Sequence, residues 1–466
     1  MAAQIALLAS TLFIVWALIN DLQREENHFV ASCVPLVWMA ILGSRPVLKW
    51  FYPVQGLDTH PEDGNIIDSL ILSTLMLIAL WILVARKLNW EQWYRDNLWF
   101  CLFFLYCGIS VFWSDYPEIA FKRWIRAVGS LSIILVVLSE ADPVKSVAAL
   151  VRRCAYILVP MSLVVVKYYH DIGVRYDQWS GKEYLVGITT DKNALGRLCM
   201  IVGLFFFWEI FTKSRIDVQI KKKREGYITI IVFLLTLWLL VKANSSTSLG
   251  SFIIGFCMLI LFCLSMVKKR ISRIGTFLTV TSLIIVVMEI TFNLTEVIVT
   301  KLLGRNMTFT DRTYIWEDLL KLHTNPLFGV GYDSFWLGQR LDYFLQKYDI
   351  DHAHNGFLAI YLELGGVGLL LFAGFLFASF WKARTSLLVD FHYGRLRMTL
   401  LFVFLFYNIT EVATKATSLL FFVLLLVVLD APRQLYLKNK TSAAFNTVRS
   451  MRSPKTFRLR YNKFKS

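Results

Sequence analysis

The stretch HAHNGFLAIYLELGGVGLLLF, from His352 to Phe372, joins a polar entrance to an apolar run that continues to residue 380. A helix rises about 1.5 Å per residue, so roughly 17–25 apolar residues cross a hydrocarbon core of about 30 Å. The run therefore predicts a membrane-spanning helix over 355–380. The rest of the chain has the same character, because 56% of its 466 residues are hydrophobic. A membrane barrel would instead show alternating segments of about ten residues, which this sequence lacks.

Similar apolar windows recur along most of the chain. Their length predicts about thirteen spans, within a range of about 12–14. They lie near residues 5–19, 29–48, 65–86, 98–113, 121–139, 147–167, 193–212, 227–241, 249–267, 275–292, 355–380, 398–412 and 416–430. The expected fold is an all-α polytopic membrane protein. No basic segment precedes the first window, so we interpret it as a retained helix and not as a cleaved signal.

Lys and Arg are densest in three connections and in the C-terminal tail. These segments are 213–226, 268–274, 381–397 and Lys438–Lys465. Cytoplasmic loops of membrane proteins carry an excess of Lys and Arg, so we assign all four segments to the cytoplasm. This orientation accounts for the net charge of +16 without a nucleic-acid partner. We expect the basic tail to lie on anionic membrane lipids.

The same orientation places the N-terminus and the remaining loops on the outer face. These loops are 50–64, 114–120, 167–192, 242–248, 293–354 and 408–415. The loop 293–354 is the longest, and its helical apolar spacing predicts a structured element that carries function. The predicted organisation is therefore spans over 1–292, the long outer loop 293–354, spans over 355–430 and a basic cytoplasmic tail over 431–466.

The seven cysteines lie mostly inside apolar runs, and no CxxC pair is present. This pattern is typical of small core side chains, so it predicts neither a disulfide framework nor a metal site.

The polar entrance of the opening stretch contains the first candidate for chemistry. Asn355 is a favourable helix N-cap, and His354 precedes it near the outer interface. An imidazole in this position can accept a proton near neutral pH, as a general base must. The alternative is that His352 and His354 are interfacial polar residues without a chemical role.

Three further patterns accompany this histidine. Arg312 and Trp316 are four residues apart, NPLFGVGYDSF runs from Asn325 to Phe335, and His354-Asn355 precedes a GxxG pair formed by Gly365 and Gly368. Together they resemble the O-antigen ligase and Wzy-type polymerase family. The segments TTDKNALGR (189–197) and SSTSLG (245–250) are most similar to exopolysaccharide polymerases.

The resemblance implies a GT-C-like glycosyltransferase of the bacterial inner membrane with its site facing the periplasm. It implies inverting transfer without a metal or other cofactor, from a glycan on undecaprenyl pyrophosphate to an acceptor glycan. His354 would deprotonate the acceptor hydroxyl, and Arg312 would bind the donor pyrophosphate. Arginine is suited to this role because its planar fork matches phosphate oxygens. Chain-length-control proteins, export proteins and membrane lipids are the implied partners, and nucleic acid is not.

One family cation is missing, because Ser246 occupies the place where relatives often carry Arg or Lys. Lys242, one helical turn earlier, could replace it, as could the outer-side residues Arg123, Arg126, Lys192 and Arg197. For Arg123 and Arg126 the alternative is snorkelling to lipid headgroups. For Lys192 and the adjacent Asn193 the alternative is simple helix capping.

Two acids and two polar neighbours complete the predicted site. Glu363 lies in the apolar run after His354, where a charge is costly, so we expect it to pair with a cation or to contact acceptor sugar. Glu411 lies in a short outer loop and could orient the base or a sugar hydroxyl, or could be solvated. His352 and Asn193 are predicted to have supporting roles.

Three other functions are alternatives to a polymerase. A ligase would share the donor and base residues and transfer the glycan to lipid A core. A transporter or flippase is the common function for this number of helices, but such proteins tend to show paired repeats, and none is visible. A non-catalytic assembly subunit would not need the Arg312 and His354-Asn355 elements together.

Overall fold

The structure is a computed structural model. It describes residues 1–22, 29–51, 66–176, 181, 183–213, 220–264, 312–322 and 324–432. The predicted span 275–292, the basic connection 268–274 and the tail 431–466 beyond residue 432 lie outside the described residues.

Every predicted apolar range within the described residues overlaps a helix, although the range 29–48 is interrupted by residues 43–47, which are not helical. These helices are α1 (Ala2–Leu22), α2 (Phe29–Leu42), α4 (Ile66–Ala85), α6 (Leu98–Ile109), α7 (Pro117–Leu138), α8 (Pro143–Tyr168), α10 (Lys192–Lys213), α11 (Ile220–Lys242), α12 (Ser246–Cys263), α18 (Gly356–Val389), α19 (Phe391–Thr410) and α20 (Leu419–Val428). The prediction of an all-α polytopic membrane protein is confirmed.

Short elements connect these helices. They are α3 (Leu48–Phe51), α5 (Trp90–Asp96), the 3-10 helix η1 (Ser110–Trp113), α9 (His170–Gly173), α16 (Arg312–Lys321), α17 (Gly338–Tyr348) and the strands β1 (Val174–Tyr176) and β2 (Glu183–Leu185). The two strands pair antiparallel, with Val174 opposite Leu185. The described part of the predicted outer loop is therefore structured, because it contains α16 and α17.

Among the described residues, six helices are long and apolar enough to cross a membrane. A seventh span forms if Trp90–Asp96 and Leu98–Trp113 are one segment bent by 95°. Other predicted spans are helical but are shorter or more charged. For example, α20 has 10 residues, and α7 carries Lys122, Arg123 and Arg126. The predicted total of about thirteen spans stays a prediction.

The predicted cytoplasmic connection 381–397 is not an extended loop. Helix α18 continues to Val389 and α19 begins at Phe391, so one residue separates them. That residue, Asp390, caps α19 by accepting a hydrogen bond from the Tyr393 amide at 3.1 Å. The hydrophilic composition of residues 381–397 concealed these helical turns, because apolar windows indicate only the hydrophobic part of a helix.

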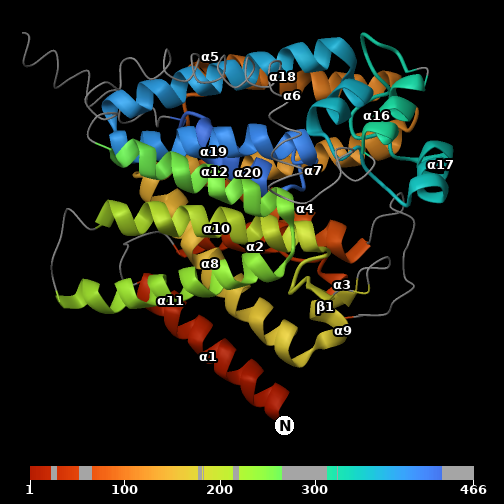
Figure 1. The fold of residues 1–466 in the computed structure, drawn as a ribbon. Coiled ribbons are helices and arrows are strands. Elements are labelled where there is room, and N and C mark those ends of the chain that lie inside the picture. Colours follow the sequence, from red (N-terminus) through yellow and green to blue (C-terminus); the bar gives the residue numbers. More distant parts are fainter. Residues whose placement is uncertain are drawn as a thin grey trace, which may run out of the picture.

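The long helices run along the molecule, and α16 and α17 lie at one end of them, at the right of Figure 1. β1 and α9 lie toward the same end. Arg340 of α17 forms an ion pair with Asp115 at 2.5 Å, which attaches the 312–354 segment to the loop before α7. The described loops predicted for the outer face therefore gather at one end of the helices.

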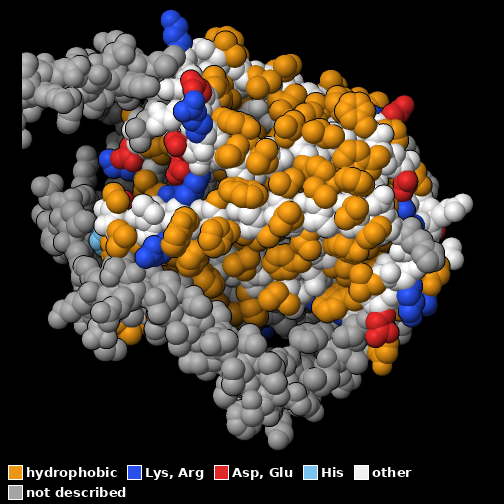
Figure 2. Space-filling view, turned by 90° about the horizontal axis from the view of Figure 1, so that it is seen from above, with side chains coloured by type: hydrophobic (Ala, Val, Ile, Leu, Met, Phe, Trp, Pro, Cys, Tyr) orange, Lys and Arg blue, Asp and Glu red, His pale blue; other side chains and the backbone are white. Residues whose placement is uncertain are grey.

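Figure 2 shows the apolar belt that this arrangement produces. Hydrophobic side chains cover the middle of the face, and Lys, Arg, Asp and Glu gather toward its two ends. A membrane protein needs such a belt where its helices meet hydrocarbon.

The glycine motifs of α18 and the 325–335 loop dock against each other. Gly365 has a φ of 65°, which interrupts the helical backbone of α18. The amide of Gly366 donates to the Pro326 carbonyl at 2.8 Å, and the amide of Gly331 donates to the Glu363 carbonyl at 2.8 Å. Glycine suits this contact because it accepts positive φ and has no Cβ. The motif thus fixes the outer loop on the helix that follows His354.

Candidate active site

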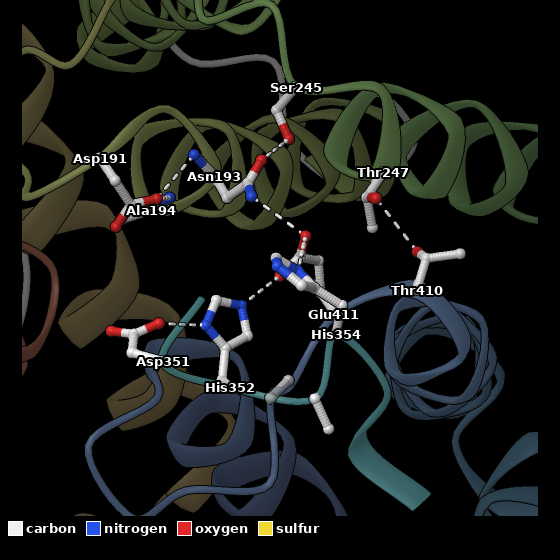
Figure 3. Close-up of polar contacts among 12 residues, drawn as sticks. Asp191, Asn193, Ala194, Ser245, Thr247, Asp351, His352, His354, Thr410 and Glu411 are labelled. Atoms are coloured by element: carbon white, nitrogen blue, oxygen red, sulfur yellow. Dashed lines mark hydrogen bonds and ion pairs between the residues drawn. The ribbon is translucent and has the colours of Figure 1, made fainter. Parts of the chain in front are cut away.

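Glu411 is at the centre of the residues that the structure brings together. Its Oε1 atom lies 3.1 Å from Arg312 Nη2, 3.1 Å from Asn193 Nδ2 and 3.2 Å from His354 Nδ1. Its Oε2 atom lies 3.3 Å from His352 Nε2. We call these five residues the Glu411 cluster, most of which is drawn in Figure 3. They come from four chain segments that are far apart in the sequence.

The end of α19 positions the carboxylate. Glu411 is the C-cap of this helix and has an extended backbone, which turns its side chain away from the helical path. Arg312 donates a second hydrogen bond to the Thr410 carbonyl. The guanidinium therefore closes the end of α19 and holds the carboxylate at the same time, as cations near helix C-termini do.

Asn193 reaches the cluster from the start of α10. The cap of α10 is Asp191, whose Oδ1 accepts hydrogen bonds from the amides of Asn193 and Ala194 at 2.9 Å each. The Asn193 side chain is therefore free of capping and bridges Glu411 to the Ser245 hydroxyl, which donates to Asn193 Oδ1 at 2.8 Å. The capping alternative is wrong for Asn193.

The outer loop sets the position of His354. Trp316 Nε1 donates to the Ala353 carbonyl at 2.8 Å, so α16 holds the chain directly before the histidine. His354 has a φ of 48°, and Asn355 then caps α18 by accepting from the amides of Phe357 and Leu358. The N-cap prediction for Asn355 is confirmed. The four-residue spacing of Arg312 and Trp316 places both on one face of α16, from which one holds Glu411 and the other holds the His354 loop.

The two histidines have opposite electrostatic environments. Burial would lower the pKa of His352, but hydrogen bonds to Asp351 and Glu411 outweigh it and raise this pKa to about 9. Burial and the neighbouring charges of His352 and Arg312 lower the pKa of His354 below its ordinary value, despite its hydrogen bond to Glu411. At neutral pH the cluster therefore contains a protonated His352 beside a neutral His354.

Glu411 is held in its charged form. Burial raises the pKa of its carboxyl, but the hydrogen bonds from His352 and His354 outweigh burial and leave this pKa well below its ordinary value. The carboxylate accepts from His354 Nδ1, so the neutral imidazole carries its proton on that nitrogen. Its Nε2 atom has no hydrogen-bond partner in the described part of the chain. The arrangement can therefore take a proton at His354 Nε2 and present cations at Arg312 and His352.

Three members of the cluster could also hold a metal ion. His352, His354 and Glu411 each offer a ligand atom, and these atoms lie within 4.8 Å of one another. Arg312 places a permanent positive charge 3.1 Å from Glu411 Oε1, which disfavours a second cation on that oxygen.

The other predicted cations are not in the Glu411 cluster. Lys192 lies over the Tyr184 ring at 5.0 Å, and the Arg197 guanidinium lies 6.0 Å from the Tyr407 ring. Lys242 is exposed at the end of α11, and Ser246 is exposed at the start of α12. Arg123 and Arg126 line a separate cavity between α4 and α7.

Glu363 is buried, as the sequence predicts. Its Oε2 atom accepts from the backbone amide of Asp333 at 3.3 Å, which the docked glycine loop supplies. No ion pair joins Glu363 to a cation among the described residues, so the expected pairing stays a prediction.

Three residues that lie beside the predicted site residues were not predicted from the sequence. Asp351 lies 2.6 Å from His352 Nδ1, and Asp333 and Lys415 line the cavity between α4 and α7. Asp351 directly precedes His352, so its adjacency was the available signal. Asp333 and Lys415 had no such signal, because they are distant in sequence from the arginines that they accompany.

The fold and the cluster define a multi-pass all-α membrane protein with a charged cluster at one end. Residues 231–373 match the family model described as O-antigen ligase. The chain is similar to the exopolysaccharide production protein ExoQ of Rhizobium meliloti (strain 1021), with 24% identity over 309 residues that cover 64% of this chain and 67% of that protein. The resemblance predicted from the motifs is confirmed. These matches support the class of membrane glycan ligases and polymerases.

Proposed function

We propose that this protein is a polysaccharide polymerase of the bacterial inner membrane, with its site facing the periplasm. It transfers a glycan from undecaprenyl pyrophosphate to a hydroxyl of an acceptor glycan, without a metal ion. The observation that carries the proposal is the convergence of Arg312, His352 and His354 on Glu411. The similarity to an exopolysaccharide production protein favours a polymerase over a ligase.

In the proposed reaction, the acceptor oxygen attacks the anomeric carbon of the donor glycan from the face opposite the pyrophosphate. The new bond joins this oxygen to the anomeric carbon, and the bond from that carbon to the pyrophosphate oxygen breaks with inversion. The hydroxyl proton goes to His354 Nε2. Undecaprenyl pyrophosphate leaves with the electron pair of the broken bond.

Each residue of the cluster has a role in this step. Arg312 and protonated His352 stabilise the charge that develops on the leaving pyrophosphate, where preorganised cations contribute most. Glu411 fixes the tautomer of His354 and balances the imidazolium that forms, and Asn193 holds Glu411 in place. The side chains of Arg312 and His354 are 16% and 19% exposed, so both remain accessible to a substrate.

The test is polymerisation by the purified full chain, supplied with undecaprenyl-pyrophosphate-linked repeat units in nanodiscs. We expect a ladder of products that His354→Ala abolishes and EDTA leaves unchanged. Loss of the ladder with EDTA and its recovery with magnesium would overturn the metal-free reaction. A product formed only with lipid A core as acceptor would identify a ligase, and movement of the lipid-linked glycan without product growth would identify a transporter.

A further inference from the structure

Two histidines and one carboxylate of the Glu411 cluster lie close enough together to share one metal ion. His352 Nε2 lies 3.3 Å from Glu411 Oε2, and His354 Nδ1 lies 3.2 Å from Glu411 Oε1. One ligand atom from each of the three residues lies within 4.8 Å of the others. Zinc ligands lie about 2.0–2.2 Å from the ion, so two ligands of a tetrahedral ion are about 3.4 Å apart. A side-chain movement of about 1 Å per residue therefore brings the three atoms to zinc distances.

Asp351 supplies a second feature of zinc sites. A histidine that binds zinc almost always donates its other ring N–H to a carboxylate or carbonyl, which fixes the ring and makes it a better ligand. Asp351 Oδ1 lies 2.6 Å from His352 Nδ1, while Nε2 of the same ring faces Glu411 (Figure 3). The outer carboxylate that a zinc-binding histidine needs is therefore already in place.

The charges around the three ligands allow a divalent cation. With neutral imidazoles, the carboxylates of Glu411 and Asp351 exceed the permanent cation of Arg312 by one negative charge. Arg312 contacts Glu411 Oε1 and leaves Oε2 on the side of His352. A metal ion that binds there releases the His352 proton to solvent, because the ligand is the neutral imidazole.

The ligand set selects the metal. Two imidazoles and one carboxylate are a known ligand set of zinc, with a fourth position left for water. Calcium and magnesium prefer oxygen ligands and bind imidazole poorly. The side chains of His352 and His354 are 29% and 19% exposed, so an ion can reach the site from solvent.

We infer that His352, His354 and Glu411 form an inhibitory Zn²⁺ site, in which Asp351 orients His352. Zinc on Nδ1 of His354 leaves the ring proton on Nε2, and zinc on Nε2 takes the lone pair directly. In either case His354 cannot accept the proton of the acceptor hydroxyl. Binding of zinc is independent of the proposed function, whereas the inhibition rests on it.

The first test measures zinc binding by the purified full chain in nanodiscs, with a histidine-free tag and without substrate. Metal analysis after dialysis against buffered free Zn²⁺ should find one ion that is lost in His352→Gln, His354→Gln and Glu411→Gln. His170→Gln removes an exposed histidine of α9 outside the cluster and should retain this ion. Millimolar magnesium or calcium should not displace it. Equal zinc contents in the wild type and the three ligand variants would overturn the site.

Two further measurements keep all three ligands. X-ray absorption of the zinc-loaded wild type should show two imidazole nitrogens and a carboxylate oxygen at about 2.0–2.2 Å, and a zinc shell without imidazole would contradict the inference. Asp351→Asn should weaken zinc binding by about 10- to 100-fold, the usual effect of removing such a partner. Asp349→Asn, which changes an exposed acid two residues earlier, should bind zinc as the wild type does. Wild-type affinity in Asp351→Asn would exclude the orienting role.

Inhibition is tested with lipid-linked repeat units. Buffered free zinc should stop ladder formation by the wild type, and EDTA should restore it. Asp351→Asn should need about 10- to 100-fold more zinc for half-inhibition, and Asp349→Asn should match the wild type. Equal sensitivity of Asp351→Asn and the wild type would assign the inhibition to zinc on the substrate pyrophosphate and would overturn inhibition through the cluster.

The two proposals fail in different ways. If the wild type forms no product but binds a zinc ion that the ligand variants lose, the proposed function fails and the metal site stands. If the wild type forms product and binds no such ion, the metal site fails and the proposed function stands.

Discussion

Two networks of arginine and carboxylate differ in how they expose their charge. In an interior network between α1, α8 and α10, Arg152 contacts Asp21 at 2.5 Å and Glu209 at 2.7 Å, and Arg153 contacts Asp21 at 2.5 Å. These side chains are 2–6% exposed. Among the described residues, two cations face two acids, and all four side chains are buried.

The Glu411 cluster is more open. Glu411 faces Arg312 and a protonated His352, which Asp351 also contacts at 2.6 Å, and the side chains of Arg312, His352 and His354 are 16–29% exposed. A buried network joins helices, whereas an exposed network can meet an anionic substrate. Access to solvent distinguishes a structural ion pair from a candidate site more clearly than the presence of arginine does.

The largest effect that this comparison predicts is a loss of kcat when the proposed general base, His354, is removed. His354→Ala should lower kcat by about 10²- to 10⁴-fold, the usual contribution of a general base. Ladder formation by purified protein in nanodiscs measures it. His170→Ala, which removes an exposed histidine of α9, should retain the wild-type rate. A His354→Ala variant with the wild-type rate would remove His354 from the mechanism.

Substitutions in the interior network should lower the stability of the protein. Asp21→Asn leaves Arg152 and Arg153 short of a carboxylate and should cost about 3–5 kcal/mol, as expected when one partner of a buried ion pair is removed. The thermal unfolding midpoint in detergent measures this loss. Glu91→Gln removes half of the exposed Arg95 pair and should change the midpoint little, since exposed pairs contribute about 0–1 kcal/mol. Equal midpoints for both variants would contradict the distinction.

Arg312 should affect rate more than stability. Arg312→Gln should lower kcat by about 10²-fold, because it removes a preorganised charge from the leaving group. Arg312→Lys should recover only part of this loss, since lysine lacks the planar fork. Arg175→Gln, which removes an exposed arginine of β1, is the control. A fall in the unfolding midpoint that matches the Asp21→Asn variant would instead make Arg312 structural.

The opposite environments of the two histidines predict a bell-shaped pH dependence of kcat/KM. His354 must be neutral to accept a proton, so the rate falls as pH drops below its pKa, which lies below 6.5. His352 must be charged to attract pyrophosphate, so the rate falls again as pH rises through about 9. Each limb should change the rate about tenfold per pH unit. His352→Gln should remove the alkaline limb, and an unchanged limb would exclude His352 from this role.

The smallest predicted effect concerns Asn193, which contacts Glu411 and no reacting atom. Asn193→Ala should lower kcat by about two- to tenfold, the range for one lost hydrogen bond. Asn193→Asp places a second negative charge beside Glu411 and should shift the acid limb of the pH profile upward, because it favours protonated His354. An unshifted limb would contradict a positioning role for Asn193.

The sequence by itself determined the helices and the motifs around Arg312 and His354. Apolar content is a local property, and each span needs only its own length to be recognised in a membrane. The pairing of Arg312 with Trp316 and the N-cap at Asn355 are also local, because they depend on residues within one or two helical turns. His354 was identifiable for the same reason.

Only the tertiary structure decided which polar residues meet. Glu411 and Asn193 are 218 residues apart along the chain, and nothing in either segment specifies that the start of α10 and the end of α19 lie together. Arg123 and Arg126 were grouped with Arg312 by their charge, yet helix packing places them in another cavity with Lys415. Long-range positions arise from the packing of whole helices, and the sequence around each residue does not contain that information.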